Sequence, residues 1–179
     1  MSINMKNIYN IRQFLDISRW ELKNIIFNKY KLFFFDRVEK SPRLELYAKI
    51  KRVYKREYYL TGNLSCKQKQ SLTKCRISAH DFQIELGRRQ KQLRDNRLCN
   101  LCDKRELGDE FHYILKCTYA PVVTIRKELM EKVNAINSGI LNLPEKELFI
   151  YLVNAHDTSI VFHFAKFLET LMKITKCIP

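Results

Sequence analysis

The sequence contains little proline or glycine, with only four residues of each among its 179. Loop-rich sandwiches and low-complexity chains need many more turn-forming residues, so the composition argues against both classes. Hydrophobic residues make up 46% of the chain, which is enough for a substantial core in one domain or in two small ones. No run of about 18 apolar residues occurs, so we expect no membrane-spanning helix.

Signals for secretion and for several kinds of catalysis are also missing. The polar start, Met1-Ser-Ile-Asn-Met-Lys6, lacks the apolar stretch of a signal peptide. We therefore expect a nuclear or cytoplasmic protein that is not secreted. No Tyr-x-Asp-Asp, adjacent aspartate pair, acidic nuclease cluster, Walker loop, Gly-x-Ser-x-Gly or His-Glu-x-x-His motif occurs. Polymerase chemistry in particular needs clustered carboxylates for its metals, so we expect this chain to have no catalysis of its own.

Six cysteines without a secretion signal favour reduced thiols and metal binding over disulfides. Four residues have metal-ligand spacing, because Cys99-x2-Cys102 is followed, after nine residues, by His112-x4-Cys117. Three thiolates and one imidazole favour zinc, and a site with four protein ligands is closed, so we expect one structural Zn²⁺. The alternatives are a chance spacing of unrelated side chains, or a Cys99–His112 nucleophile pair that leaves the other two cysteines without a use.

His112 and Cys117 are five residues apart, which an ideal helix would place about 140° from each other around its axis. We therefore expect a helix to begin near Asp109, and Cys117 to lie at or just beyond its end, where the chain turns before Pro121. Zinc would hold that turn, and its contribution to folding could be on the order of 10 kcal/mol.

The net charge of +14 is concentrated just before this motif. Residues 37–97 hold seventeen basic and six acidic side chains, whereas residues 98–179 hold ten of each. A local excess of this size would attract a polyanion, so we expect RNA or DNA as a partner. The candidate contacts are Lys51, Arg52, Lys55, Arg56, Lys74, Arg76, Arg88, Arg89, Lys91, Arg94 and Arg97. The alternative is a solvated basic face, with Tyr54, Tyr58 and Tyr59 as ordinary core residues instead of stacking platforms.

Hydrophobic periodicity predicts an all-α fold, an irregular helical bundle with a small CCHC zinc-knuckle-like unit inserted. We expect helices near 10–35, where the aromatic run 31–35 breaks the pattern, and then at 42–54, 65–78, 80–87, 122–136, 145–153 and after Asp157. Ser41-Pro42 should open the second helix and Gly87 should stop the fourth. The predicted segments are 1–64, 65–120 and 121–179.

The remaining histidines and cysteines have no ligand-like partners in the sequence. We expect His80 to be a hydrogen-bonded structural residue in place of a phosphate contact, and His156 and His163 to be surface and core residues. Cys66, Cys75 and Cys177 are expected to act as small apolar residues.

Residues 70–118 also carry several motifs in a specific order. These are Ser71-Leu-Thr-Lys-Cys-Arg-Ile-Ser-Ala-His80, Ile84-Glu-Leu-Gly-Arg-Arg89, Arg94-Asp-Asn-Arg-Leu-Cys-Asn-Leu-Cys102 and Asp109-Glu-Phe-His-Tyr-Ile-Leu-Lys-Cys117. They resemble the zinc-binding region downstream of the reverse transcriptase domain in animal non-LTR (LINE-like) retrotransposons. Cys75 stands where the family usually has an aromatic residue, and Gly108-Asp109 replaces an acidic pair; neither departure removes a ligand.

The resemblance implies a C-terminal segment of a retrotransposon polyprotein, or a host gene derived from one, that grips template RNA or target DNA beside an upstream reverse transcriptase domain. Two alternatives remain at this point. The chain could be a zinc-stabilised helical module that binds protein through aromatic patches, or a decayed fragment without function. The oligomeric state is not predicted.

Overall fold

The computed structural model describes residues 17–176, which divide into two compact units at Ser41–Pro42. The predicted segment boundaries after residues 64 and 120 both lie inside the second unit. Helices dominate both units, and residues 17–176 contain no strand, only an isolated antiparallel bridge between Leu98 and Leu107. The predicted all-α class is confirmed.

The first unit is built on α2, Arg19–Lys40. Ser18 begins it with a capping box, in which its hydroxyl accepts from the Glu21 amide and the Glu21 carboxylate accepts from the Ser18 amide. The aromatic run 31–35 interrupts the predicted apolar spacing but not the helix, which continues five residues beyond the predicted end to Lys40. Residues 10–16 of the predicted helix lie outside the described residues.

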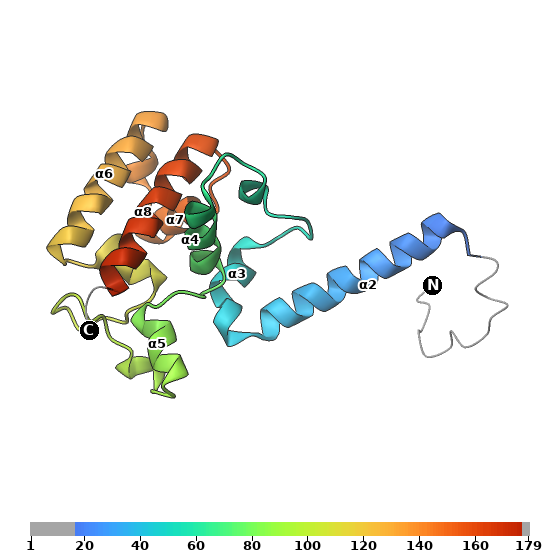
Figure 1. The fold of residues 1–179 in the computed structure, drawn as a ribbon, viewed down its shortest axis with the longest axis horizontal. Coiled ribbons are helices and arrows are strands. Elements are labelled where there is room, and N and C mark those ends of the chain that lie inside the picture. The colour runs from blue at the N-terminus through green and yellow to red at the C-terminus, as the bar shows by residue number, and fades with distance from the viewer. Residues whose placement is uncertain (1–16, 177–179) are drawn as a thin grey trace. The chain divides into compact units, whose positions relative to one another are not determined.

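The second unit contains the remaining elements, most of which are short (Figure 1). In chain order they are η2 (Pro42–Leu44), α3 (Glu45–Ile50), η3 (Tyr58–Leu60), α4 (Cys66–Arg76), α5 (Gln83–Arg89), η4 (Arg94–Asn96), η5 (His112–Lys116), α6 (Ala120–Ile136), η6 (Ile140–Asn142), α7 (Glu145–Val153) and α8 (Thr158–Lys176).

Helix α8 forms the centre of this unit and packs against α4, α6 and α7 (Figure 1). Asp157 caps it by accepting from the amides of Ser159 and Ile160. Its predicted apolar stripe is buried in full: Ile160, Phe164, Phe167, Leu168, Leu171 and Met172. None of the helices within residues 17–176 combines the length and apolar character that a membrane span requires.

Two predicted helix boundaries are wrong. Ser41 follows the end of α2, and α3 begins only at Glu45, after a 3₁₀ turn and without a side-chain cap, and stops at Ile50. Gly87 lies inside α5, where an added Cβ would stand 2.5 Å from the Arg97 Cγ. That glycine therefore makes room for Arg97, and Lys91 (φ 58°) is the residue with left-handed backbone after the helix.

A buried ion-pair network joins the chain before α4 to the core. The Glu57 carboxylate accepts from Lys51 at 2.5 Å, from Arg76 at 3.0 Å and from the Tyr47 hydroxyl at 2.9 Å. Arg76 also donates to the carbonyl of Val153 at the end of α7. Charged groups this deeply buried need such partners, so this network fixes the 51–57 segment against α4 and α7.

Candidate metal centre

A narrow loop supplies the first two cysteines. Its two sides pair through the Leu98–Leu107 bridge, with the Cys99 amide donating to the Glu106 carbonyl at 2.8 Å and the Gly108 amide donating to the Arg97 carbonyl at 2.9 Å. The pairing folds the chain back on itself, so Cys99 and Cys102 lie on one tight turn.

A short, widened helical turn supplies the other two ligands. Asp109 caps it by accepting from the His112 amide at 2.8 Å, which confirms a helix start near this residue. The turn at His112–Lys116 is a π-helix, in which the Cys117 amide donates to the His112 carbonyl five residues earlier. Cys117 lies just beyond it, as predicted, and the wide turn removes most of the angular offset that an α-helix would impose between the two ligands.

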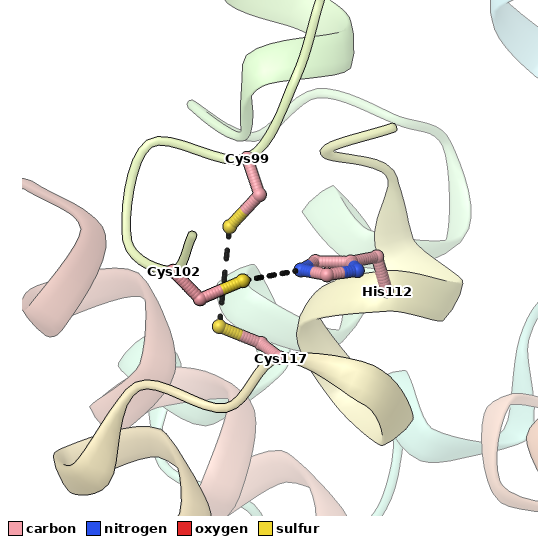
Figure 2. A group of neighbouring side chains, drawn as sticks. All are labelled: Cys99, Cys102, His112 and Cys117. Atoms are coloured by element: carbon pink, nitrogen blue, oxygen red, sulfur yellow. Dashed lines mark hydrogen bonds between the residues drawn. The ribbon is translucent and has the colours of Figure 1, made fainter. Parts of the chain in front are cut away.

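The four side chains converge on one small volume (Figure 2). The ligand atoms of Cys99, Cys102, His112 and Cys117 all lie within 4.8 Å of one another. The Cys99 and Cys117 sulfurs are 3.9 Å apart, and the Cys102 sulfur is 3.3 Å from the His112 Nε2. Zn–S and Zn–N bonds in a tetrahedron imply about 3.8 Å between sulfurs and about 3.6 Å between sulfur and nitrogen. The four residues therefore fit a single metal ion.

The surroundings of the cluster favour a thiolate at Cys99. The Leu101 amide donates to the Cys99 sulfur at 3.4 Å. A hydrogen bond from the Cys117 thiol holds the pKa of Cys99 well below its usual range, and the same contact, together with burial, raises the pKa of Cys117. Burial would lower the pKa of His112, but hydrogen bonds with Cys99 and Glu106 raise it to about 9. These shifts place a thiolate at Cys99 and protons on Cys117 and His112, and a cation that binds at the cluster would take the place of those protons.

Two residues that the sequence analysis did not identify support the ligands. The Glu106 carboxylate lies 2.9 Å from the His112 Nδ1, which leaves Nε2 facing the cluster. Arg126 of α6 donates to the carbonyls of Tyr113, Ile114 and Cys117 at the end of the π turn. Neither residue follows a ligand spacing, so no signal in a single sequence could have found them.

A second buried cluster joins Ser78 and His80 to residues 97–117, the segment that carries the four candidate ligands and is called the metal unit below. Ser78 and the His80 Nε2 both bond to the same Glu110 oxygen, at 2.5 and 2.7 Å, and the His80 ring stacks on Phe82. Burial would raise the pKa of Glu110, but the hydrogen bonds from His80 and Ser78 outweigh it and lower that pKa. His80 is therefore a structural histidine, as predicted.

The eleven predicted nucleic-acid contacts do not share one environment. Arg52, Lys55, Arg56, Arg89, Lys91 and Arg94 are exposed, and Lys74 and Arg88 are half-buried. Arg89 pairs with Asp81 at 2.6 Å, and Arg88 pairs with Glu85 at 3.0 Å. Arg94 lies 3.8 Å from Glu45, the same carboxylate that Lys49 contacts at 2.9 Å. The basic residues Lys49 and Arg94, which are far apart in the sequence, thus meet at Glu45.

Three of the predicted contacts have structural roles instead. Lys51 and Arg76 are buried in the Glu57 network, so predicting them as phosphate contacts was wrong. Both were chosen for charge alone, which does not reveal that Glu57 neutralises them inside the core. Arg97 is half-buried and donates to the carbonyls of Gln92 and Ile84, which holds the arm 92–97 against α5.

The other candidate residues are only partly as predicted. Cys75 is buried, as suits a small apolar residue, whereas Cys66 is exposed; Cys177 lies outside the described residues. His156 is exposed, as predicted, and His163 is half-buried on α8. Tyr59 belongs to the core, which favours the structural interpretation of that tyrosine.

Comparisons of the chain with protein-family models, with curated proteins and with solved structures found no match.

Proposed function

We propose that this chain is a zinc-stabilised module that binds RNA or DNA and has no catalysis of its own. The metal part of the proposal rests on the donor set, because three thiolates and one imidazole within 4.8 Å suit zinc better than harder cations. With the ion bound, Cys99, Cys102, His112 and Cys117 would hold it, and its charge would be balanced by the thiolates. The ion would stabilise the fold and would take no part in catalysis.

One observation carries the nucleic-acid part of the proposal. Basic side chains from two separate stretches, Arg43 and Lys49 on one side and Arg88 and Arg94 on the other, line the same cavity together with Lys146 of α7. Arginine suits phosphate because its planar fork can grip two oxygens at once, and positive charge gathered on one side attracts a polyanion. The motif resemblance to non-LTR retrotransposons supports the same partner, and with it an upstream reverse transcriptase domain.

A salt titration of binding tests this proposal. The affinity for single-stranded RNA and for duplex DNA should fall linearly with salt on logarithmic axes, with a slope close to the number of phosphates contacted. Replacing exposed Arg52, Lys55 and Arg56 by alanine should reduce that slope by about one for each lost contact. The matched control replaces three exposed lysines of α6 and α8, Lys127, Lys132 and Lys166. No binding at low salt, or equal losses in both triple variants, would contradict the proposal.

A second candidate function is protein binding through the first unit. Helix α2 exposes several large apolar side chains, including Trp20 and Leu32, each 72% exposed. Exposed apolar side chains in such number are typical of protein contacts. Trp20 is the only tryptophan in the chain, so its fluorescence reports on α2 directly. A blue shift of its emission on adding a protein partner, together with no binding to nucleic acid at low salt, would favour this function.

A further inference from the structure

The second unit contains a cavity of about 330 Å³ directly beside the metal unit. Its walls come from residues 42–49, from α5 and η4, from residues 109–111 just before His112, and from α7. Its volume is at the lower end of the range for small-molecule pockets, about 300–1,000 Å³. A single small group could enter it, whereas a helix or a duplex could not.

The interior of this cavity is apolar and partly aromatic. Leu46, Ile84, Phe111, Phe149 and Ile150 line it, and the Phe111 and Phe149 rings meet edge to face with centroids 5.5 Å apart. The metal unit and α7 therefore contribute one ring each. Aromatic rings of this kind are what unstacked bases pack against in proteins that bind single strands.

The charged groups around the cavity leave a positive surplus. Four carboxylates line it, and each is already engaged: Glu45 by Lys49, Glu85 by Arg88, Asp109 by the His112 amide, and Glu110 by Ser78 and His80. Among the described residues, Arg43 and Lys146 have no ion pair with a carboxylate, and Arg94 has only the long contact of 3.8 Å to Glu45. The lining therefore has five cations against four carboxylates, a surplus of one positive charge, and Arg43, Arg94 and Lys146 are the cations least occupied by ion pairs, although Arg43 also donates from its Nε to the Ser78 carbonyl at 3.1 Å.

We propose that this cavity binds one unstacked nucleotide of a single strand, with its base against Phe111 and Phe149 and its phosphates at Arg43, Arg94 and Lys146. The inference rests on the proposed function and deepens it, because it assigns a base-binding site to a surface otherwise defined by charge. An apolar slot with cations at its mouth matches the two parts of a nucleotide, whereas a bare polyanion would need only the cations.

The test compares two oligonucleotides of equal length and charge, one with bases and one fully abasic. Base stacking contributes about 1–3 kcal/mol per base, so the full chain should bind the strand with bases about tenfold more tightly. Ile150→Phe fills the cavity without changing charge and should abolish this preference. Ile136→Phe on the exposed end of α6 is the matched control and should retain it. Ribose and deoxyribose versions of the strand show which sugar is accepted.

Charge at the cavity mouth is tested separately. Arg43→Glu should weaken binding to both oligonucleotides by a similar factor, whereas Lys127→Glu on α6 should change neither. Titration of adenosine monophosphate, followed by methyl NMR, should shift the signals of Leu46, Ile84 and Ile150. This measurement uses the unmodified protein and does not depend on any variant folding.

The outcomes separate the two proposals. Equal binding of both oligonucleotides, a preference that survives Ile150→Phe, or an unshifted methyl spectrum would overturn the nucleotide cavity while leaving charge-driven binding in place. No binding of either oligonucleotide at low salt would overturn the proposed function and the cavity together.

Discussion

The sulfurs of Cys99 and Cys117 lie 3.9 Å apart although the two residues are eighteen positions apart in the chain. Both side chains are buried, and two neighbouring groups, Glu106 and Arg126, fix the histidine ring and the end of the π turn between them. A group of thiolates held this closely repels itself unless a cation neutralises it. At the scale of the residue, we therefore expect a bound cation to stabilise this arrangement.

Replacing one ligand should remove the metal and destabilise the protein. Cys117→Ser leaves three ligands and breaks the closed site, so we expect loss of bound zinc and a thermal midpoint lower by ten degrees or more, because structural zinc contributes on the order of 10 kcal/mol. Cys66→Ser is the matched control, since Cys66 is exposed and outside the cluster. Metal analysis and thermal unfolding of both variants check this. Equal zinc content in the two would contradict the assignment.

Glu57 provides a test that is independent of the metal. Glu57→Gln removes the carboxylate that neutralises Lys51 and Arg76, leaving two buried cations without it. Breaking a buried pair by removing one partner costs on the order of 3 kcal/mol, so unfolding in urea should occur at a clearly lower midpoint. The exposed pair of Glu45 and Lys49 is the control, and Glu45→Gln should cost about 1 kcal/mol or less. Similar losses in both variants would contradict the network's role.

The same carboxylate predicts a pH dependence. Burial would raise the pKa of Glu57, but the hydrogen bond from Lys51 and the charge of Arg76 lower it below the ordinary value of 4.5. A lowered pKa in the folded state stabilises the fold above about pH 4.5, and this contribution is lost as the pH falls through the folded-state value. The difference in unfolding free energy between the unmodified protein and Glu57→Gln should therefore shrink at acidic pH. A difference that stays constant from pH 7 to pH 3.5 would refute this. Any loss of metal at acidic pH affects both proteins equally, so it cancels from the difference between their unfolding free energies.

At the scale of the element, much of the second unit follows from its sequence. The boundaries 145–153 and the apolar stripe of α8 are confirmed. Helix α8 could be predicted because it is long and strongly periodic and has a capping residue in Asp157. The clustering of Cys99, Cys102, His112 and Cys117 could also be predicted, since their spacing is itself the signal. What the sequence could not reveal depends on distant partners: Lys51 and Arg76 look like surface charges until Glu57 and the Val153 carbonyl are seen beside them.

Two glycines show the same limit, because their role is to let elements approach closely. An added Cβ at Gly108 would stand 2.7 Å from the Gln83 Cβ of α5 and 3.2 Å from the backbone of Cys99. Gly87 was predicted to end α5, but it lies within that helix and makes room for Arg97. Neither contact is local in sequence, so periodicity and turn propensity could not predict it.

Gly108→Ala should therefore loosen the contact between α5 and the metal loop. The clash involves backbone and a Cβ, which cannot move aside as the end of a long side chain can, so we expect a loss of about 1–3 kcal/mol. Gly62→Ala is the control, since the nearest atom to its added Cβ is a carbonyl oxygen at 3.8 Å. Denaturant unfolding of the two variants measures the difference. An unchanged denaturation midpoint for Gly108→Ala would contradict a close contact between α5 and the metal loop at this glycine.

At the scale of the whole molecule, the metal cluster and the helical core of the second unit are continuous. Tyr113, Ile114 and Cys117 belong to the same buried cluster as the apolar residues of α4, α6 and α8. Removing the metal should therefore destabilise all of this unit and not the loop alone. Chelation should lower hydrogen-exchange protection throughout α8, and adding zinc back should restore it. Loss of protection confined to residues 97–117 would instead indicate a detachable metal loop.

The central claim is that Cys99, Cys102, His112 and Cys117 hold one zinc ion, and elemental analysis of the purified, reduced protein tests it most directly. We predict one zinc atom per chain, and less than a tenth of that in Cys117→Ser prepared in the same way. A protein that is folded and reduced, and yet contains no zinc, would contradict the account.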